Sequence, residues 1–268
     1  MYNWEWAAPM LLALKKDGRL NFCIDYRKLN LMTIKDSYPI PRVDECIDSL
    51  GNASVFTTLD VYSGYRQVAI KPEDRHKSAF VCHAGQFQYV RMAFGLTNAP
   101  ATFQRALDMI LSRFKWKTCL VYIDDVIIYS KSVEEHIRHV DEVLTALKKA
   151  GVTLKMKKCT FFSDTVDYLG HVINPGRLEI DVTNTASLRD AKPPQTRTEL
   201  RSFLGLCNVY RRFIKDFTVL AHPLNRLLKK GEPDRFELDE EQLRSFRSFI
   251  DRICTPPILA LPIPNLPY

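Results

Sequence analysis

The chain has 268 residues, of which 46% are hydrophobic and 26% charged, and its formal net charge is +7. These values fit one large or two modest globular domains and exclude a largely disordered chain, while the basic balance favours a polyanionic partner. Seven scattered cysteines without a Cys-x-x-Cys pair favour a reducing, intracellular setting over a disulfide framework or a zinc site. No apolar run reaches the roughly 18 residues that a membrane span needs, so we expect no membrane partner.

The first 130 residues have the pattern of short strands separated by turns. We expect apolar residues 7–14 to form a core strand. Runs rich in β-branched and aromatic residues predict further strands at residues 22–26, 55–60, 66–70 and 79–82. Dipeptides such as Asp17-Gly18 and Gly51-Asn52 supply the turns.

Two amphipathic helices follow from apolar residues at helical spacing. The first should begin with Asn98 as its cap and Pro100 in its first turn, and its expected apolar positions are Phe103, Leu107, Ile110, Leu111 and Phe114. The second should begin with a capping box of Ser132 and Glu135, and its expected apolar stripe is Val133, Ile137, Val140, Leu144 and Leu147. His136 and His139 offer too few ligands for a structural zinc.

After about residue 175 the sequence becomes helical and basic. Thr196 and Glu199 predict another capping box, and the expected buried positions of this helix are Leu200, Phe203, Leu204, Cys207, Tyr210 and Ile214. Residues 192–231 contain nine Lys or Arg and two Asp or Glu, which gives a net charge of +7. The basic surplus of the chain is therefore concentrated in one segment. Residues 255–268 contain five prolines and predict an extended connector.

Residues 119–129, CLVYIDDVIIY, predict a β-hairpin with Asp124 and Asp125 at its turn. A solvated loop tip is the ordinary alternative for such a pair. Asp60 ends another predicted strand, VFTTLD. If both strands lie in one sheet, the three carboxylates gather at its edge, and oxygen-preferring Mg²⁺ would relieve their repulsion. Two such ions, about 3.5–4 Å apart, serve phosphoryl transfer.

Several blocks resemble reverse transcriptases and occur in the order of that family: LDVYSGYRQV (59–68), FGLTNAPATFQR (94–105), YIDD (122–125) and LGHVI (169–173). The segment FLGLCNVYRRFI (203–214) is similar to the thumb of the Ty3/Gypsy class of long-terminal-repeat retrotransposons. The resemblance extends from about Trp6 to Tyr268. It implies an α+β, right-hand polymerase fold, with fingers and an antiparallel palm sheet at residues 1–175, a helical thumb at 176–250, and the start of a connector toward ribonuclease H at 251–268.

The resemblance also implies an RNA-directed DNA polymerase, a nucleotidyltransferase that extends a DNA primer on an RNA or DNA template with deoxynucleoside triphosphates. Two Mg²⁺ ions would be its cofactors, with Mn²⁺ as a substitute. The expected location is intracellular, in the cytoplasm, a virus-like particle or the nucleus, and the oligomeric state stays open. The implied catalytic and metal-binding residues are Asp60, Asp124 and Asp125, with the carbonyl of Val61 as a further metal ligand.

By the same resemblance, one set of residues binds the incoming nucleotide: Lys15, Lys16, Ser63, Gly64, Tyr65, Phe94, Gly95, Lys157 and Lys158. Within this set the Tyr65 ring would exclude a 2′-hydroxyl, although a core aromatic is the plain alternative, and either Lys157 or Lys158 would protonate pyrophosphate. A second set would contact template and primer: Tyr122, Leu169, Gly170, His171, Arg197, Arg201, Arg211, Arg212 and Lys215. Contacts of this basic kind give salt-dependent binding with little sequence preference.

The sequence departs from the family pattern at Asn21, where an arginine usually grips the triphosphate. Asn cannot replace a charged bidentate fork. By the same resemblance, we expect the chain to begin downstream of further fingers residues and to stop before ribonuclease H. These departures favour an alternative function: a truncated, catalytically impaired remnant that still binds nucleic acid. A structural module without nucleic acid would leave the basic helical segment unexplained.

Overall fold

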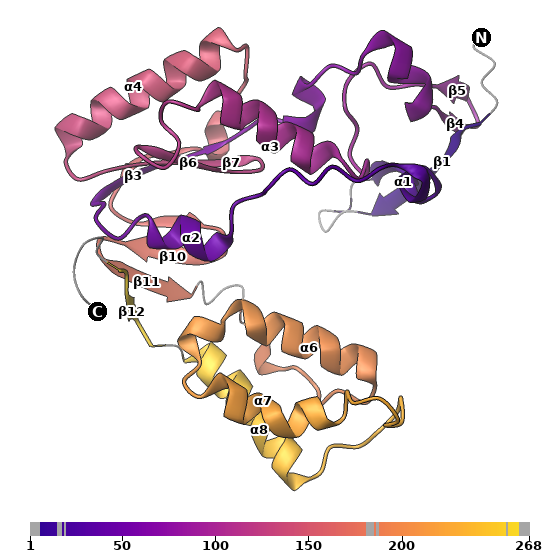
Figure 1. Ribbon diagram of the computed structural model, residues 1–268, viewed down its shortest axis with the longest axis vertical. Helices are drawn as coiled ribbons and strands as arrows, with labels where there is room; N and C mark the ends of the chain where they lie inside the picture. The colour runs from indigo at the N-terminus through magenta and orange to yellow at the C-terminus, as the bar shows by residue number, and fades with distance from the viewer. Residues whose placement is uncertain are drawn as a thin grey trace. The chain divides into compact units, whose positions relative to one another are not determined.

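The chain divides into two compact units, which are described separately (Figure 1). The computed structural model describes residues 6–14, 18, 20–180, 185, 188–255 and 257–262. The first unit contains residues 1–49 and 53–164, and the second contains residues 50–52 and 165–268. The domain boundaries expected near residues 175 and 250 stay predictions. The combination of helices with mainly antiparallel sheets confirms the α+β class.

The central sheet of the first unit is antiparallel throughout, as expected for the palm. Its strands, in spatial order, are β6 (Cys119–Tyr122), β7 (Asp125–Ser130), β3 (Val55–Asp60) and β8 (Thr160–Ser163). The β6–β7 hairpin confirms the strands predicted around the acidic pair, and β3 begins and ends where its apolar pattern predicts. The sheet positions the three acids because Asp60 ends β3, Asp125 begins β7, and Asp124 lies in the turn just before β7.

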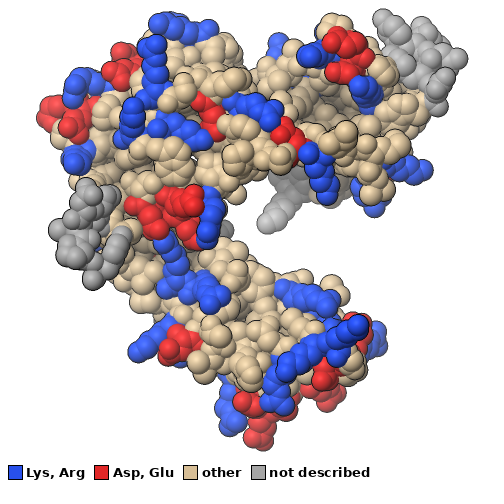
Figure 2. Space-filling view, in the orientation of Figure 1, with Lys and Arg blue, Asp and Glu red and all other residues tan. Residues whose placement is uncertain are grey.

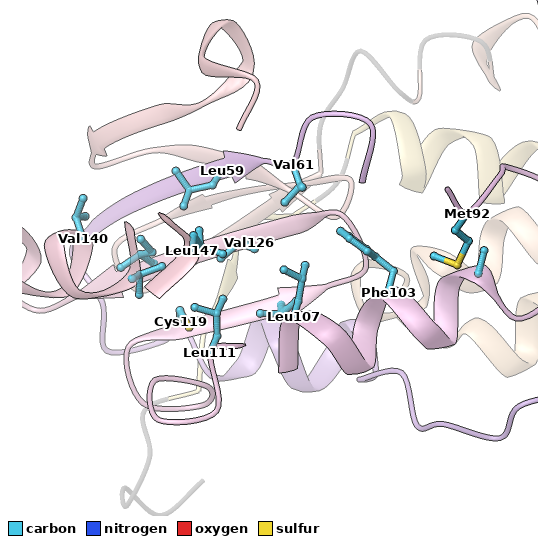
Figure 3. Close-up of a cluster of buried hydrophobic side chains, with 14 residues drawn as sticks. Leu59, Val61, Met92, Phe103, Leu107, Leu111, Cys119, Val126, Val140 and Leu147 are labelled. Atoms are coloured by element: carbon cyan, nitrogen blue, oxygen red, sulfur yellow. The ribbon is translucent and has the colours of Figure 1, made fainter. Parts of the chain in front are cut away.

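Two helices pack on this sheet, α3 (Ala99–Ile110) and α4 (Val133–Lys149). Figure 3 shows the core that they enclose, in which Phe103 and Leu107 of α3 face Leu59 and Val126 of the sheet. Truncation of such a buried leucine to alanine costs about 2–5 kcal/mol of stability. This core fixes α3 against the strands that carry the acids.

The predicted details of these two helices are only partly correct. Ser132 accepts a hydrogen bond from the backbone N–H of Glu135, as expected of a cap. Asn98 does not cap α3, because its side chain instead accepts from the N–H of Asp36 and donates to a neighbouring carbonyl. The predicted stripe of α4 is wrong at Val133 and Ile137, which are exposed.

In the first turns of α4, the buried side chain is that of His136. Its Nε2 lies 2.8 Å from Thr57 Oγ1 and its Nδ1 lies 2.8 Å from Ser130 Oγ. Because these two hydroxyls pair with both ring nitrogens, the imidazole can be buried without leaving a polar atom unsatisfied. Burial, with His139 nearby, lowers the pKa of His136 to about 4, which keeps the ring neutral.

A second sheet of the first unit holds β2 (Leu20–Ile24), β1 (Ala8–Leu14), β4 (Phe80–Cys82) and β5 (Gly85–Phe87), in that order. Residues 7–14 do form a strand, but the prediction that it is a core strand is wrong. Only Ala8 is buried, in a small cluster with Tyr26 and Ala93, whereas Leu12 and Leu14 are exposed. Strands β1 and β2 form an antiparallel hairpin, and no described residues cover the end of it that contains Leu12 and Leu14.

Short helices replace some of the predicted strands. Residues 66–70 were expected to form a strand, but residues Gly64–Gln67 form the 3-10 helix η1, which begins directly after Ser63, a residue in the left-handed conformation with φ 49°. The first unit also contains helical segments that the strand pattern did not predict: α1 (Arg27–Met32), α2 (Val43–Asp48), η2 (Pro72–Ser78) and η3 (Met156–Lys158).

The second unit has a small antiparallel sheet and a helical part. The sheet order is β12 (Leu259–Ala260), β11 (Arg177–Ile180), β10 (His171–Asn174) and β9 (Val166–Tyr168). The helices are α6 (Arg197–Val209), η4 (Arg211–Phe213), α7 (Phe217–Arg226) and α8 (Glu240–Cys254). Among the described residues, no helix is both long and apolar enough to traverse a bilayer.

The predicted apolar face of α6 is correct. Leu200, Phe203, Leu204 and Cys207 are buried, as are Tyr210 and Ile214 just beyond it. Thr196 accepts from the N–H of Glu199, but the Glu199 carboxylate accepts from Gln195 rather than from Thr196. The capping box is therefore displaced by one residue. Strand β12 shows that part of the proline-rich end pairs with a sheet instead of running free.

Candidate active site

Strand register brings the three acids of the predicted constellation to one sheet edge. Asp60, the last residue of β3, is the cross-strand partner of Asp125, the first residue of β7. Paired residues in an antiparallel ladder have Cα atoms about 4.5–5.5 Å apart. Asp124 lies in the two-residue turn of the β6–β7 hairpin, and its carbonyl accepts from the N–H of Val61 at 3.3 Å. Their role in catalysis stays a prediction.

The charge at this edge is not balanced within the protein. Burial, then the Asp125 and Asp60 charges, raise the pKa of Asp124. Partial loss of hydration and the Asp60 charge raise the pKa of Asp125, and the Lys158 ammonium opposes that rise. Oxygen Oδ1 of Asp124 is buried without a hydrogen-bond partner. A buried carboxylate oxygen without a donor has the chemistry of a cation ligand.

Asp60 is turned toward a lysine. Its Oδ2 lies 3.2 Å from Lys158 Nζ, and both side chains are partly exposed. The N–H of Lys155 donates to the Asp60 carbonyl, which ties the segment before η3 to the end of β3. In the described part of the chain, no three His, Cys, Asp or Glu side chains are arranged to hold a metal ion. The unpartnered Oδ1 of Asp124 and the adjacent carboxylates fit a cation by their charge, while the Asp60 carboxylate is paired with Lys158.

A cleft of about 470 Å³ lies in the first unit, and it is lined by Phe22, Cys23, Ile24, Ser63, Arg66, Tyr89, Phe94 and Gly95. Three expected nucleotide-binding residues, Ser63, Phe94 and Gly95, are among its walls. Arg66 was not predicted from the sequence. It lies within the LDVYSGYRQV block, but nothing in that pattern distinguishes its side chain or shows that it faces the cleft.

Tyr65 and Gly64 lie between this cleft and the acids. The Tyr65 ring packs against Phe94 with centroids 5.0 Å apart and against the edge of Phe103 at 5.7 Å. Burial and the nearby Asp124 raise the pKa of Tyr65. Gly64 is packed so closely against the Asp124 side chain that an added Cβ would lie 2.9 Å from Asp124 Oδ1. Glycine is thus required beside the carboxylate.

Some expected nucleotide-binding residues cannot be placed. Lys15 and Lys16 lie outside the described residues. Asn21 is part of β2, but its side chain lies outside the described part of the structure. Of the two expected lysines in η3, Lys158 contacts Asp60, whereas Lys157 is exposed beside it. Tyr122 ends β6 as the cross-strand partner of Asp125.

The predicted primer-contacting turn belongs to the second unit. Leu169 and Gly170 connect β9 to β10 with φ values of 49° and 80°, a conformation that Gly adopts freely. His171 is buried, and its Nδ1 lies 3.0 Å from the Leu169 carbonyl. The imidazole stacks on Phe213 of η4, with centroids 5.9 Å apart and an angle of 23°. This stack ties the turn to the helical part of the same unit.

The basic residues of the second unit differ in what holds them. The Arg197 guanidinium donates to the backbone carbonyls of Leu228, Lys229 and Glu232. The Arg211 guanidinium lies 4.9 Å above the Phe217 ring and remains exposed. Arg201, Arg212 and Lys215 are exposed as well. On the face seen in Figure 2, basic and acidic side chains alternate over the helices of this unit.

Comparison with known proteins identifies a family. The family described as "Reverse transcriptase (RNA-dependent DNA polymerase)" matches residues 13–173. The chain is 42% identical over 206 residues to the Retrovirus-related Pol polyprotein from transposon gypsy of Drosophila melanogaster, covering 77% of this chain and 20% of the relative. It is 35% identical over 253 residues to the Transposon Tf2-3 polyprotein of Schizosaccharomyces pombe, covering 94% and 19%. The chain thus spans a minor part of these relatives.

Solved structures show the same fold. A foamy viral protease-reverse transcriptase in complex with dsDNA superposes with a TM-score of 0.86 at 23% identity, covering 97% of this chain and 54% of that one. The same viral protein in complex with an RNA/DNA hybrid gives a TM-score of 0.80 at 23% identity, covering 93% and 34%. These likenesses confirm the predicted polymerase fold.

Proposed function

This chain belongs to the reverse transcriptase family, within the Ty3/gypsy group of retrotransposon Pol polyproteins, and from that premise we propose that it extends a DNA primer on an RNA or DNA template. The substrates would be deoxynucleoside triphosphates. The observation that carries the proposal is the pairing of Asp60 with Asp125 beside the buried, unpartnered Oδ1 of Asp124. A plain loop tip would leave its acids solvated and would not require this burial.

The acids would hold two divalent cations, Mg²⁺ or in its place Mn²⁺, with the Val61 carbonyl as a further ligand. Bound there, the ions would activate the primer 3′-hydroxyl and stabilise the leaving oxygen in an in-line displacement. The raised pKa values of Asp124 and Asp125 support this assignment, because bound cations would favour the ionised forms that burial disfavours.

Lys158 would have two successive partners. In the absence of cation its ammonium neutralises Asp60 at 3.2 Å. If Asp60 held a cation, the Lys158 ammonium would be free beside the acids, where it would neutralise and protonate departing pyrophosphate. Lys157 lacks the described contact with Asp60, so the geometry favours Lys158 for this role.

The cleft beside η1 would receive the nucleotide. Ser63 and Gly64 would offer backbone N–H groups to the triphosphate, and the Tyr65 ring would exclude a ribose 2′-hydroxyl. Phe94 and Gly95 would line the base and sugar, and Lys15 and Lys16 would neutralise the phosphates. Arg66 adds a guanidinium to this cleft, a group that suits bidentate binding of phosphate oxygens.

Template and primer would contact the second unit. The exposed side chains of Arg201, Arg211, Arg212 and Lys215 suit phosphate contacts, and the Leu169–Gly170 turn would contact the primer. In the first unit, Tyr122 would contact nucleic acid as well. His171 would act by holding that turn through its stack on Phe213. Arg197 would act mainly by holding the segment after α7, since its two terminal NH₂ groups donate to carbonyls there. An intracellular location, in the cytoplasm, a virus-like particle or the nucleus, completes the proposal.

Primer extension on poly(rA)/oligo(dT) with Mg²⁺ tests this function. We expect extension by the wild-type chain and its loss in Asp124→Asn, while Asp141→Asn, an exposed carboxylate on α4, retains it. No extension by the wild type, together with salt-sensitive duplex binding, would reject catalysis in favour of a nucleic-acid-binding remnant. Extension that survives Asp124→Asn would reject the assigned acids.

A further inference from the structure

A glutamine on α3 holds the turn that carries Asp124. Gln104 is fully buried, and its side-chain amide makes three hydrogen bonds. Its Nε2 donates to the carbonyl of Val121 at 3.0 Å and to Asp108 Oδ1 at 2.9 Å. Its Oε1 accepts from the N–H of Ile123 at 2.7 Å. The amide therefore binds the backbone on both sides of Tyr122, the residue at which β6 ends.

The partners allow the amide only one orientation. A carboxylate and a carbonyl can only accept, so the NH₂ group must face Asp108 and Val121, and the oxygen must face the N–H of Ile123. Asp108 is itself held by the Tyr38 hydroxyl at 2.7 Å and by Lys115 Nζ at 2.6 Å. Asp108, which is itself held by these two side chains, therefore fixes the orientation of the Gln104 amide.

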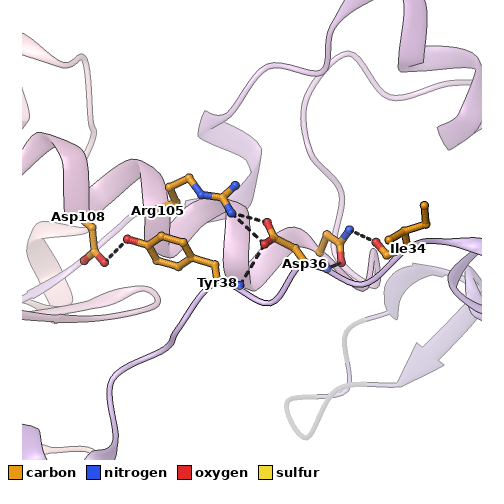
Figure 4. A network of polar contacts seen from close by, with 6 residues as sticks. Ile34, Asp36, Tyr38, Arg105 and Asp108 are labelled. Atoms are coloured by element: carbon orange, nitrogen blue, oxygen red, sulfur yellow. Dashed lines mark hydrogen bonds and ion pairs between the residues drawn. The ribbon is translucent and has the colours of Figure 1, made fainter.

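The support of Asp108 extends to a distant segment of the first unit. Figure 4 shows Arg105, the neighbour of Gln104 on α3, bound to Asp36 while Tyr38 reaches Asp108. The Arg105 guanidinium also lies 4.7 Å above the Tyr38 ring. The segment from residue 34 to 38 is therefore attached to the same turn of α3 that presents Gln104.

The turn needs external support. Ile123 adopts φ 54°, in the left-handed region that β-branched residues rarely occupy. Such a conformation persists only where the surroundings enforce it. Gln104 satisfies the N–H of this residue, and the next residue along the chain is Asp124. Gln104 therefore binds the backbone of the turn immediately before Asp124.

We propose that Gln104 is a positioning residue that presets the Asp124 carboxylate for a divalent cation by fixing the Ile123–Asp124 turn. This inference rests on the proposed function, because it assigns to Asp124 the role of a cation ligand. Gln104 itself touches neither substrate nor cation. Its contribution is to remove the need for the turn to reorganise when the cation enters.

Replacement by methionine tests the inference, because Gln104→Met keeps nearly the same volume and removes all three hydrogen bonds. We expect the Mg²⁺ concentration for half-maximal extension to rise about tenfold or more. Since a displacement of about 1 Å at a reacting group costs on the order of 100-fold in rate, kcat should fall about 10- to 100-fold. The KM for the nucleotide should change less than about threefold, because the cleft residues remain in place.

Binding of Mn²⁺, measured by the loss of its free electron paramagnetic resonance signal, supplies a readout that does not need activity. Gln104→Met should weaken this binding about tenfold. Gln104→Glu, which keeps an acceptor for the Ile123 N–H but repels Asp108, should weaken it as well and serves if the methionine variant does not fold. Circular dichroism establishes that each variant is folded at the assay temperature.

Ser130→Ala is the matched control, because Ser130 lies at the opposite end of β7 and bonds His136 and His139 there. It should lower stability by a similar amount and leave Mn²⁺ affinity unchanged. Equal Mn²⁺ affinities of wild type and Gln104→Met would overturn the inference, as would an equal loss of affinity in Ser130→Ala. A wild-type chain that binds Mn²⁺ but extends no primer would reject the proposed function and leave the inference to be decided by binding alone.

Discussion

Gly64→Ala places a methyl group against a predicted cation ligand. The added Cβ would lie 2.9 Å from Asp124 Oδ1 and 2.9 Å from Phe103 Cε1, whereas ordinary contacts begin at 3.4 Å. Phe103 is buried in the core between α3 and the sheet, so it cannot easily withdraw. The Asp124 carboxylate is the less confined neighbour, and we expect it to move by at least the missing 0.5 Å.

The size of the effect follows from that displacement. A shift of about 1 Å in a reacting group costs on the order of 100-fold in rate, so half that shift should reduce kcat about 10-fold or more. Overpacking of a filled site costs about 1–3 kcal/mol of stability. Single-turnover incorporation of one nucleotide measures the first effect, and urea unfolding measures the second.

Gly205→Ala is the control for this substitution. Gly205 lies inside α6, and a Cβ added there would meet no atom within 4 Å. Alanine should stabilise that helix by up to about 1 kcal/mol and leave incorporation unchanged. If Gly64→Ala incorporates nucleotide at the wild-type rate, the carboxylate is not where catalysis requires it, and the reasoning fails.

Three further predictions concern charge. In EDTA, Asp124→Asn should raise stability at pH 7 and have little effect near pH 3.8, because a raised carboxyl pKa makes wild-type stability fall as the pH rises through the raised value; urea unfolding at both pH values tests this. Arg66→Ala should raise the KM for nucleotide about tenfold, the equivalent of one charge-assisted hydrogen bond to phosphate of about 1.5 kcal/mol, and leave kcat within threefold; an unchanged KM would place Arg66 outside the nucleotide site. Arg201→Ala should reduce the salt slope of duplex binding by about one unit, whereas Arg197→Ala should mainly lower thermal stability, since its guanidinium is engaged by carbonyls; equal slopes for the two variants would contradict that distinction.

Sequence patterns predicted the parts of this protein that depend on local periodicity. The CLVYIDDVIIY hairpin and the buried face of α6 follow directly from alternating and helical spacing of apolar residues. The same spacing could not show that residues 7–14 form a mostly exposed strand, because an apolar run does not reveal which other layer covers it. It also could not predict η1, because the β-branched composition of residues 66–70 favours a strand and does not reveal the left-handed Ser63 that precedes the helix.

The polar contacts around the site were beyond sequence reasoning for a different reason. Asn98 resembles a helix cap but bonds the segment around Asp36, and the resemblance included Gln104 without giving it a role. Such residues are defined by partners that are distant in sequence. Asp60, Asp124 and Asp125 could be predicted because a family pattern marks them, whereas Arg66 has no distinguishing mark in the sequence and emerges only as a wall of the cleft.

The pairing of Asp60 with Asp125 has a consequence for how the protein folds. The two residues are far apart in the chain, so the acidic edge exists only after β3 has found β7 across a long loop, a slow, non-local step. A slip of one residue between these strands would send one carboxylate to the opposite face. Chains in the wrong register would therefore lack the paired carboxylates. Under the proposed function, a nascent chain would gain cation affinity only in the step that completes the sheet.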